Sequence, residues 1–408
     1  MQSSDIPQSL DYLLIYKSNP NLAKKIVEKV ELYLQAFQMP DINLQVIQSL
    51  SFHGIPDEIK GLRSLGWRLL LGYLHKDKSK WASILDQNLK NYESFIKEFL
   101  VYKNKENQNV SKNPNSINFV SVKDHPLNKS KESDWNILFK DLELWDEIEK
   151  DTKRTRSEIS FFLDKTDPQS TYPILSRYVK KDPRFASKTE QFHKVANSDE
   201  KPEVQHDVMT RMLFLYAKLN PGVRYVQGMN EILAPIYYVF SHDGNPFFKK
   251  YIESDSFFCF SILMGEIKDG FIRSLDNSSA GIKARIEFFH ETLQKLEPEI
   301  CKHFDEQGIH PQFYSLRWLM LLLTQEFQIS DVLRLWDSLL SHPNKMLYLN
   351  FLCSAIVIAS KEKLMGEEFS GIMETLQNTD EYDLTKLLTI ANKLYKENCE
   401  TWENYKKF

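Results

Sequence analysis

The hydrophobic residues of this chain recur mainly every three or four positions, as they do on one face of an α-helix. The first such face follows Asn19-Pro20, a cap residue with a proline at the first helical position. We predict that this helix ends near Met39-Pro40, because proline cannot continue it. Its apolar members are Leu22, Ile26, Val30, Tyr33, Leu34 and Phe37.

Similar patterns continue along the chain. A second helix is predicted just after Gly54-Ile55-Pro56, and another over His206 to Leu219, which ends at Asn220-Pro221-Gly222. Convincing strand alternation and β-α-β units are absent, so the predicted fold class is all-α, an irregular multi-helix domain. Four later segments are apolar on most sides, as in helices of a large core: residues 256–267, 313–327, 331–340 and 347–360.

Composition narrows the possible partners. The chain has 52 basic and 56 acidic residues, a formal net charge of -4 and no long basic block, which disfavours nucleic acid. Its longest apolar runs, 232–240 and 318–323, are far shorter than the roughly 20 residues that cross a bilayer. Its N-terminus lacks a secretory signal pattern, so we expect a cytoplasmic protein without a transmembrane segment.

Common catalytic and metal-binding patterns are not found. There is no G-x-S-x-G, H-E-x-x-H or G-x-G-x-x-G motif. His206-Asp207 could pair a base with an acid in a hydrolase, but adjacent helical residues point about 100° apart and no nucleophile is evident. No metal site is predicted, and the cysteines are interpreted as buried apolar side chains: Cys259, Cys301, Cys353 and Cys399.

Two polar stretches remain as candidate functional residues. Asp151 and Arg154 are three residues apart at the end of a predicted helix, so the carboxylate can orient the guanidinium. A charged helix end that complements the helix dipole would look the same. Gln227 lies between Tyr225 and Gly228 before an apolar helix, where it could also cap the helix or satisfy a loop carbonyl.

Together these stretches resemble the motifs of the TBC-domain GTPase-activating proteins that act on Rab GTPases. The family pattern I-x-x-D-x-x-R is matched by Ile148, Asp151 and Arg154. The pattern Y-x-Q-G is matched by Tyr225, Gln227 and Gly228. The third pattern, S-R-W-x-x-x-x-F, keeps Arg317 and Trp318 but has Leu316 and Leu323 in place of its serine and phenylalanine.

The resemblance implies a role for each matched residue. Arg154 would be an arginine finger and Gln227 a glutamine finger, both supplied to the active site of the GTPase. Asp151 would orient Arg154, and Ile148 would anchor the motif in the core. Tyr225 would position the loop, and Gly228 would let its backbone approach the GTPase. Trp318 is expected to belong to the scaffold, whereas Arg317 could pair internally or support the fingers.

The resemblance also implies the partner. It would be a GTP-bound Rab that carries its own GTP and Mg²⁺, so the chain would need no cofactor and catalyse no turnover alone. The expected role is regulation of vesicle trafficking, with a peripheral encounter with endomembranes through the Rab. The alternative is a noncatalytic helical adaptor. The predicted domains are an N-terminal helical extension (1–49), a TBC domain (50–380) with a flexible polar insertion (103–134), and a C-terminal helical tail (381–408).

Overall fold

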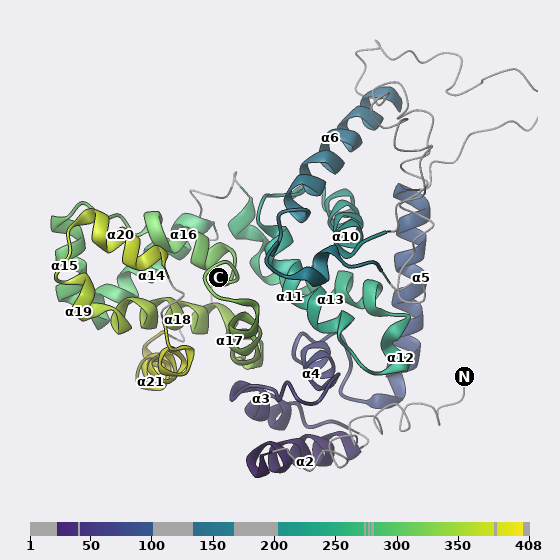
Figure 1. Ribbon diagram of the computed structural model, residues 1–408, viewed down its shortest axis with the longest axis horizontal. Coiled ribbons are helices and arrows are strands. Elements are labelled where there is room, and N and C mark those ends of the chain that lie inside the picture. Colours follow the sequence, from purple (N-terminus) through teal and green to yellow (C-terminus); the bar gives the residue numbers. More distant parts are fainter. Residues whose placement is uncertain are drawn as a thin grey trace, which may run out of the picture. The chain divides into compact units, whose positions relative to one another are not determined.

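The computed structural model describes residues 23–39, 41–100, 134–166, 203–272, 275, 278, 281–378 and 382–402. These ranges are helical and contain two isolated β-bridges but no strand, which confirms the expected all-α fold class. Figure 1 labels the helices. The chain divides into two compact units. Unit 1 comprises residues 1–84, 231–248 and 258–408, and unit 2 comprises residues 85–230 and 249–257.

Unit 1 begins with α2 (Lys24–Gln38), α3 (Leu44–Phe52) and α4 (Leu62–Leu70). α2 ends as predicted, with a buried face that includes Val30 and Phe37. The hydrophobic pattern does not identify α3, because nine residues are too few to show a clear period. α3 packs between α2 and α4 in sequence order and also contacts α17 (Ile329–Ser341).

The predicted helix after Pro56 begins later than expected. Residues 57–61 form turns, and Gly61 precedes α4 with a φ of 83°, in the left-handed region that favours glycine. The chain therefore uses a glycine, and not the proline, to set the start of α4.

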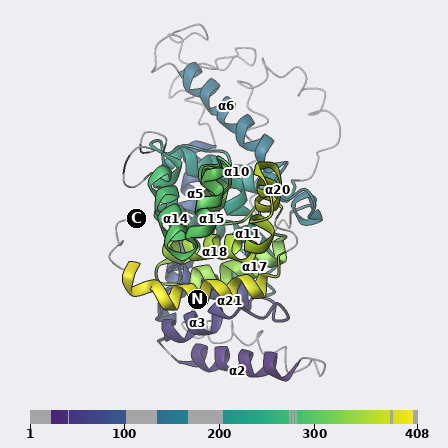
Figure 2. The ribbon, with the colours of Figure 1, turned by 90° about the vertical axis from the view of Figure 1, so that its left-hand side faces the viewer.

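The rest of unit 1 is a helical array around α18 (Lys345–Ala359), which packs against α14, α16, α17 and α21. α21 lies beside α18 in this array (Figure 2). The remaining elements are η2 (Lys78–Lys80), η4 (Lys268–Phe271), α14 (Ile282–Leu296), α15 (Pro298–Glu306), α16 (Gln312–Met320), α19 (Lys361–Leu364), α20 (Phe369–Gln377) and α21 (Leu384–Trp402).

The predicted helix over 313–327 is wrong in its second half. α16 ends at Met320, and residues 321–326 form turns in which Leu322 and Leu323 have φ values of 52° and 61°. Both leucines are buried, and the Leu322 carbonyl accepts a hydrogen bond from Trp336 Nε1 at 3.1 Å. Burial alone explains the apolar run, so it is not evidence of a continuous helix.

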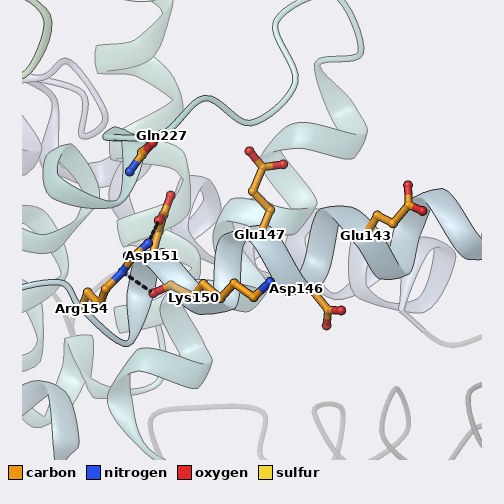
Figure 3. Close-up of a pocket in the computed structure, with 7 residues that line it drawn as sticks. All are labelled: Glu143, Asp146, Glu147, Lys150, Asp151, Arg154 and Gln227. Atoms are coloured by element: carbon orange, nitrogen blue, oxygen red, sulfur yellow. Dashed lines mark hydrogen bonds and ion pairs between the residues drawn. The ribbon is translucent and has the colours of Figure 1, made fainter. Parts of the chain in front are cut away.

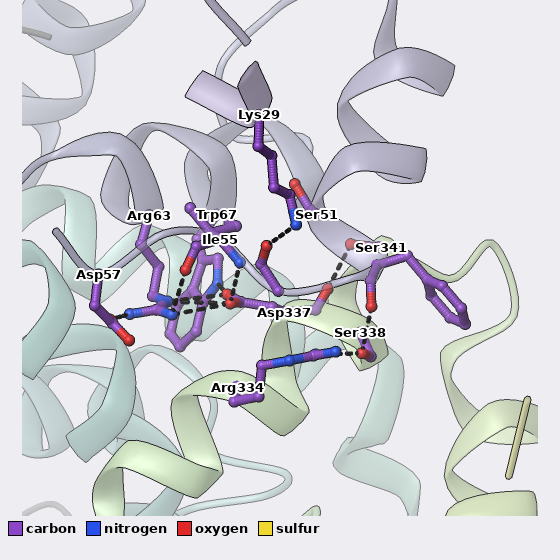
Figure 4. Close-up of polar contacts among 12 residues, drawn as sticks. Lys29, Ser51, Ile55, Asp57, Arg63, Trp67, Arg334, Asp337, Ser338 and Ser341 are labelled. Carbon is purple, nitrogen blue, oxygen red and sulfur yellow. Dashed lines mark hydrogen bonds and ion pairs between the residues drawn. The ribbon is translucent and has the colours of Figure 1, made fainter. Parts of the chain in front are cut away.

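Asp337 is the polar centre of unit 1. Its fully buried carboxylate accepts hydrogen bonds from Ile55 N at 2.7 Å, Trp67 Nε1 at 2.8 Å and Arg63 Nη2 at 3.0 Å (Figure 4). Burial raises the pKa of Asp337, and Arg63 together with the N–H donors opposes that rise. Because Arg63 and Trp67 lie one turn apart on α4, this carboxylate ties α4 to α17.

Unit 2 contains α6 (Asp134–Thr152), η3 (Ser160–Leu163), α10 (Gln205–Leu219) and most of α5 (Trp81–Phe99). α6 packs along α10, where Lys218 Nζ donates to Asp141 Oδ1 at 2.7 Å. The helix predicted over 206–219 is confirmed as α10. Each of three further helices contains residues of both units: α11 (Met229–Ser241), α12 (Pro246–Lys249) and α13 (Ile252–Ile267).

α13 and α18 are apolar on most sides because they are core helices. Phe260 and Leu263 of α13 and Phe351 and Cys353 of α18 are fully buried. Within the described ranges, no helix combines the length and the apolar character that crossing a membrane requires.

Three of the four cysteines are buried as predicted, namely Cys259, Cys301 and Cys353. Burial raises the pKa of the Cys301 thiol to about 11. Cys399 on α21 differs from the expectation, since it is only half-buried.

The predicted domain boundaries at 49/50 and 380/381 stay predictions. Residues 103–133 of the predicted insertion lie outside the described residues, and Asp134 is the first residue of α6. The helix predicted to resume at this point is confirmed, and it carries the first candidate motif.

Candidate functional site

The first motif lies where α6 ends. Ile148 is fully buried on α6, and a turn over residues 153–158 follows the helix. Arg154 donates from Nη2 to Asp151 Oδ1 at 2.8 Å and from Nε to the Lys150 carbonyl at 3.1 Å. The rest of the guanidinium has no hydrogen-bond partner in the described part of the chain. The guanidinium of Arg154 therefore has a fixed direction, and its remaining N–H groups are available to another molecule.

The neighbouring cation shows what an ordinary charged helix end looks like. Lys153 Nζ lies 3.0 Å from Glu149 Oε1 in a partly exposed i,i+4 pair, which contributes little to stability. Arg154 differs because its carboxylate partner, Asp151, is buried. A buried carboxylate holds an arginine in a defined orientation, which a solvated pair does not.

The second motif forms the loop between α10 and α11, as the sequence predicts. Gly228 has a φ of 103°, a conformation that favours glycine, and Met229 N donates to the Val226 carbonyl at 3.1 Å. Arg224 also has a positive φ, at 63°, which is uncommon for a residue with a side chain. The exposed Gln227 amide makes no hydrogen bond to the described residues, so it neither caps α11 nor satisfies a loop carbonyl.

The two motifs meet through buried polar side chains. Tyr225 donates its hydroxyl hydrogen to Asp151 Oδ2 at 2.8 Å, while Asp151 Oδ1 accepts from Arg154. One carboxylate therefore serves both loops. Asn230 Nδ2 donates to Thr155 Oγ1 at 2.8 Å, a second connection between the same loops. Sequence reasoning missed Thr155 and Asn230, whose only signal is that they are polar residues directly beside the motifs.

Arg154 and Gln227 line one cavity of about 370 Å³. Figure 3 shows Asp151 between Gln227 and Arg154, with the other lining side chains arranged along α6. The remaining lining residues are Glu143, Asp146, Glu147 and Lys150. The structure thus brings together Arg154 and Gln227, which lie 73 positions apart in the sequence.

The cavity is rich in carboxylates. Four acidic residues line it, against two cations, Lys150 and Arg154. A cavity of this charge is poorly suited to hold a free polyphosphate by itself, because the carboxylates repel it. No cluster of three or more metal-ligating side chains occurs among the residues that the structure describes.

The third motif belongs to unit 1. Arg317 on α16 is half-exposed and donates from Nε and Nη2 to the two carboxylate oxygens of Glu326 at 2.6 and 2.8 Å. Trp318 is buried and packs against Tyr314 with ring centroids 5.3 Å apart. Arg317 is thus paired internally in this structure, and the functional roles expected for both residues stay predictions.

His206 and Asp207 lie in the first turn of α10. Asp207 Oδ2 accepts from Val204 N at 3.2 Å, which caps the start of the helix. His206 Nδ1 lies 3.5 Å from Asp207 Oδ1, beyond ordinary hydrogen-bond length. This geometry matches the structural interpretation of the pair and gives no support to a hydrolase.

The fold and the paired motifs define a class of protein. Residues 135–365 match the model of the Rab-GTPase-TBC domain. This is more than half of the chain and includes all three motifs. The chain belongs to the Rab-GTPase-TBC domain family.

Three relatives show which members of this family the chain is similar to. The chain is 38% identical over 384 residues to TBC1 domain family member 13 of Homo sapiens, covering 87% of this chain and 94% of that protein. It is equally identical, with the same coverage, to TBC1 domain family member 13 of Mus musculus. A TBC domain-containing protein of Schizosaccharomyces pombe is 30% identical, covering 86% of this chain and 70% of that protein. The resemblance of the motifs to this family, and within it to the member 13 subgroup, is thereby confirmed.

Solved structures support the fold. The crystal structure of the Ypt/Rab-GAP domain of Gyp1p matches with a TM-score of 0.66 at 20% identity, covering 92% of this chain and 99% of that chain. A Chlamydomonas flagellar RabGAP TBC domain matches with a TM-score of 0.52 at 15% identity, covering 96% and 94%. At these identities the comparison concerns the fold alone.

Proposed function

We propose that this chain stimulates GTP hydrolysis by a Rab-family GTPase, to which it supplies Arg154 and Gln227. The observation that carries the proposal is that both side chains line one cavity and keep polar groups available. Family membership supports a Rab as the partner. The expected setting is vesicle trafficking, with the Rab bringing the cytoplasmic chain to endomembranes.

Arg154 would act on the charge of the transition state. In phosphoryl transfer, negative charge develops on the phosphate oxygens, and a guanidinium stabilises it through planar, permanently charged donors. The hydrogen bond from Arg154 to Asp151 sets the direction of the guanidinium before the GTPase binds. This preorganisation lowers the entropy that must be lost in reaching the transition state.

Gln227 would act on the attacking water. An amide both donates and accepts hydrogen bonds, so it can hold a water molecule and a γ-phosphate oxygen together. Its side chain is exposed and has no partner in the described residues, as a group that works on another protein requires. Gly228, with its positive φ, keeps side-chain bulk away from this approach.

The nucleotide and its metal would come with the partner. The acidic cavity lining disfavours free GTP, whereas a GTPase already neutralises its nucleotide with Mg²⁺ and its own donors. The chain would therefore complete an active site without binding a cofactor, and it would have no turnover alone.

The test is phosphate release from a panel of GTP-loaded Rabs with the wild-type chain, Arg154→Ala and Gln227→Ala. We expect stimulation of one or a few Rabs, reduced by about 10³ to 10⁵ in Arg154→Ala. Gln227→Ala should reduce it by about 10² to 10³, the usual effect of removing one transition-state donor.

Lys153→Ala is the matched control, since it removes a neighbouring cation that does not line the cavity. It should leave stimulation within about twofold of wild type, as expected of a partly exposed pair of little energetic weight. If the wild-type chain binds a GTP-loaded Rab but stimulates none of the panel, the noncatalytic adaptor replaces this proposal.

A further inference from the structure

Two residues outside the family motifs, Thr155 and Asn230, join the two finger-bearing loops. We infer that they are positioning residues, which hold Arg154 and Gln227 in one fixed relation for hydrolysis. The inference rests on the proposed function for its catalytic consequence, but its structural basis is independent of any GTPase.

The first part of the argument is the orientation of the Asn230 amide. Gly228 N lies 3.1 Å from Asn230 Oδ1, and a backbone N–H can only donate, so the side-chain oxygen must face Gly228. The Nδ2 group therefore faces Thr155 Oγ1, at 2.8 Å. Asn230 binds the backbone of the glutamine loop with one end and the arginine loop with the other.

The second part of the argument is that the Thr155 hydroxyl has a single hydrogen to donate. Its hydroxyl accepts from Asn230 Nδ2 and donates its only hydrogen to the Asp151 carbonyl at 3.0 Å. The donors and acceptors along this connection are therefore mutually consistent: Asn230 Nδ2 donates to Thr155 Oγ1, and Thr155 Oγ1 donates to the Asp151 carbonyl. Thr155 and Asn230 are both buried, where such directional bonds are strong and costly to leave unmade.

These bonds close a ring with those already described. Asp151 Oδ2 accepts from the Tyr225 hydroxyl, the backbone leads from Tyr225 to Asn230, and Asn230 Nδ2 donates to Thr155 Oγ1, which donates to the Asp151 carbonyl. The Tyr225 hydroxyl also lies 3.1 Å from Asn230 Oδ1, but its single hydrogen is donated to Asp151. The ring crosses between the loops twice. A single crossing would let the loops pivot, whereas two crossings fix their relative orientation.

The structure offers a matched control for ordinary packing. Thr152 is also a buried threonine of the same segment, and its Oγ1 lies 2.7 Å from Thr210 Oγ1 on α10. It joins α6 to α10 without touching the glutamine loop. Thr152→Val and Thr155→Val therefore remove similar buried hydroxyls, but only the second opens the ring.

The experiment measures two properties of the full chain. The first is hydrogen–deuterium exchange of the Gly228 amide, resolved by NMR, which reports its bond to Asn230 without a GTPase. The second is the rate of stimulated hydrolysis under saturation, separated into kcat and KM for a Rab that the wild-type chain stimulates. The variants are Thr155→Val, Thr155→Ser, Asn230→Leu and the control Thr152→Val, with thermal unfolding recorded for each.

We expect Asn230→Leu, which removes the acceptor of the Gly228 amide, to speed exchange at Gly228 by about tenfold, the effect of losing one hydrogen bond. Thr155→Val, which releases the other end of the Asn230 side chain, should speed this exchange by about threefold. Both variants should lower kcat by about 10- to 100-fold, since misplacing a catalytic group is costly, and leave KM within about twofold. Thr155→Ser, which keeps the hydroxyl, should restore both properties. Thr152→Val should change thermal unfolding but neither Gly228 exchange nor kcat.

Unchanged Gly228 exchange in folded Thr155→Val and Asn230→Leu would overturn the ring. Faster exchange with an unchanged kcat would overturn the positioning role and leave only a structural one. An equal loss of kcat in Thr152→Val would assign the effect to general packing. If the wild-type chain stimulates no Rab, the proposed function fails, and Gly228 exchange still decides whether the ring couples the loops.

Discussion

Each unit of the molecule contains an arginine–aspartate pair, and the two pairs are used differently. In unit 1, Arg63 and Asp337 have side chains that are 9% and 0% exposed, and the carboxylate also accepts from Ile55 and Trp67. In unit 2, Asp151 is 8% exposed, whereas its partner Arg154 is 72% exposed. The two carboxylates are buried to a similar extent, whereas one arginine is buried and the other is exposed.

The difference lies in the donors that each arginine has left after pairing with its carboxylate. Arg63 donates to Asp337 and to the Ile55 carbonyl, so its donors are used within unit 1. Arg154 is oriented by one carboxylate and one carbonyl but leaves donors for another molecule. A buried carboxylate can thus hold an arginine within the core, as Asp337 does, or orient an exposed arginine toward solvent, as Asp151 does.

The largest contrast is expected in stability. Arg63→Ala should lower the free energy of unfolding by about 3 to 5 kcal/mol, because it leaves a buried carboxylate without its counter-charge. Arg154→Ala should lower it by only about 1 kcal/mol, because Asp151 keeps the Tyr225 hydroxyl as a donor and lines a cavity. Urea unfolding followed by tryptophan fluorescence measures both, since Trp67 lies in the Asp337 network. Equal losses in the two variants would remove the distinction between the pairs.

The next contrast concerns catalysis. Asp151→Ala should lower stimulated hydrolysis by about 10- to 100-fold, or about 1.4 to 2.7 kcal/mol of activation free energy, because Arg154 and Tyr225 lose their shared partner. Phosphate release from a responsive Rab measures the change. Glu149→Ala, which removes the carboxylate of the partly exposed pair with Lys153, is the control and should retain the wild-type rate. A similar loss in the control would indicate a general electrostatic effect of α6.

The smallest effect is expected at the edge of the Asp337 network. Burial and the nearby Arg334 lower the pKa of Lys29 to about 8, while Asp337 offsets part of this shift. Lys29 donates to the Gly54 carbonyl in this region. Between about pH 8 and the ordinary lysine pKa of 10.5, the unfolded chain binds more protons than the folded one. The contribution of Lys29 to stability should therefore increase as the pH rises through this window.

Lys29→Met should remove this contribution. The difference in urea midpoint between wild type and Lys29→Met isolates it from tyrosines and cysteines that titrate in the same range. We expect the wild type to gain stability relative to the variant from pH 8 to 10. A difference that stays constant over this range would contradict the lowered pKa.

The helical fold was largely predictable from the sequence because most of its helices are long and periodic. α10 ends at Leu219, where Asn220, Pro221 and Gly222 stop the pattern. α3 was not predicted, since it has nine residues and a cap, Asn43, that resembles any loop asparagine. No helix was predicted for α5, α14, α15 or α20 either. The run after Met320 was misinterpreted because buried leucines in turns have the same composition as a buried helix.

The candidate site was predictable only as far as its motifs. Asp151 and Arg154 are neighbours on one turn, so spacing alone suggests their contact. The bond between Asn230 and Thr155 joins residues 75 positions apart, and no periodicity encodes such a contact. Likewise, Asp337 lies 274 positions from Arg63, and only the fold brings their charges together.

The acidic lining of the cavity has a consequence for how such a protein can diversify. Glu143 and Glu147 lie on α6 outside the ring that joins the two loops. Under the proposed function, substitutions at these positions would alter which surfaces the chain attracts or repels without breaking the bonds that orient Arg154. Partner choice and chemistry would then depend on separate residues, so a lineage or an engineer could change the first while keeping the second.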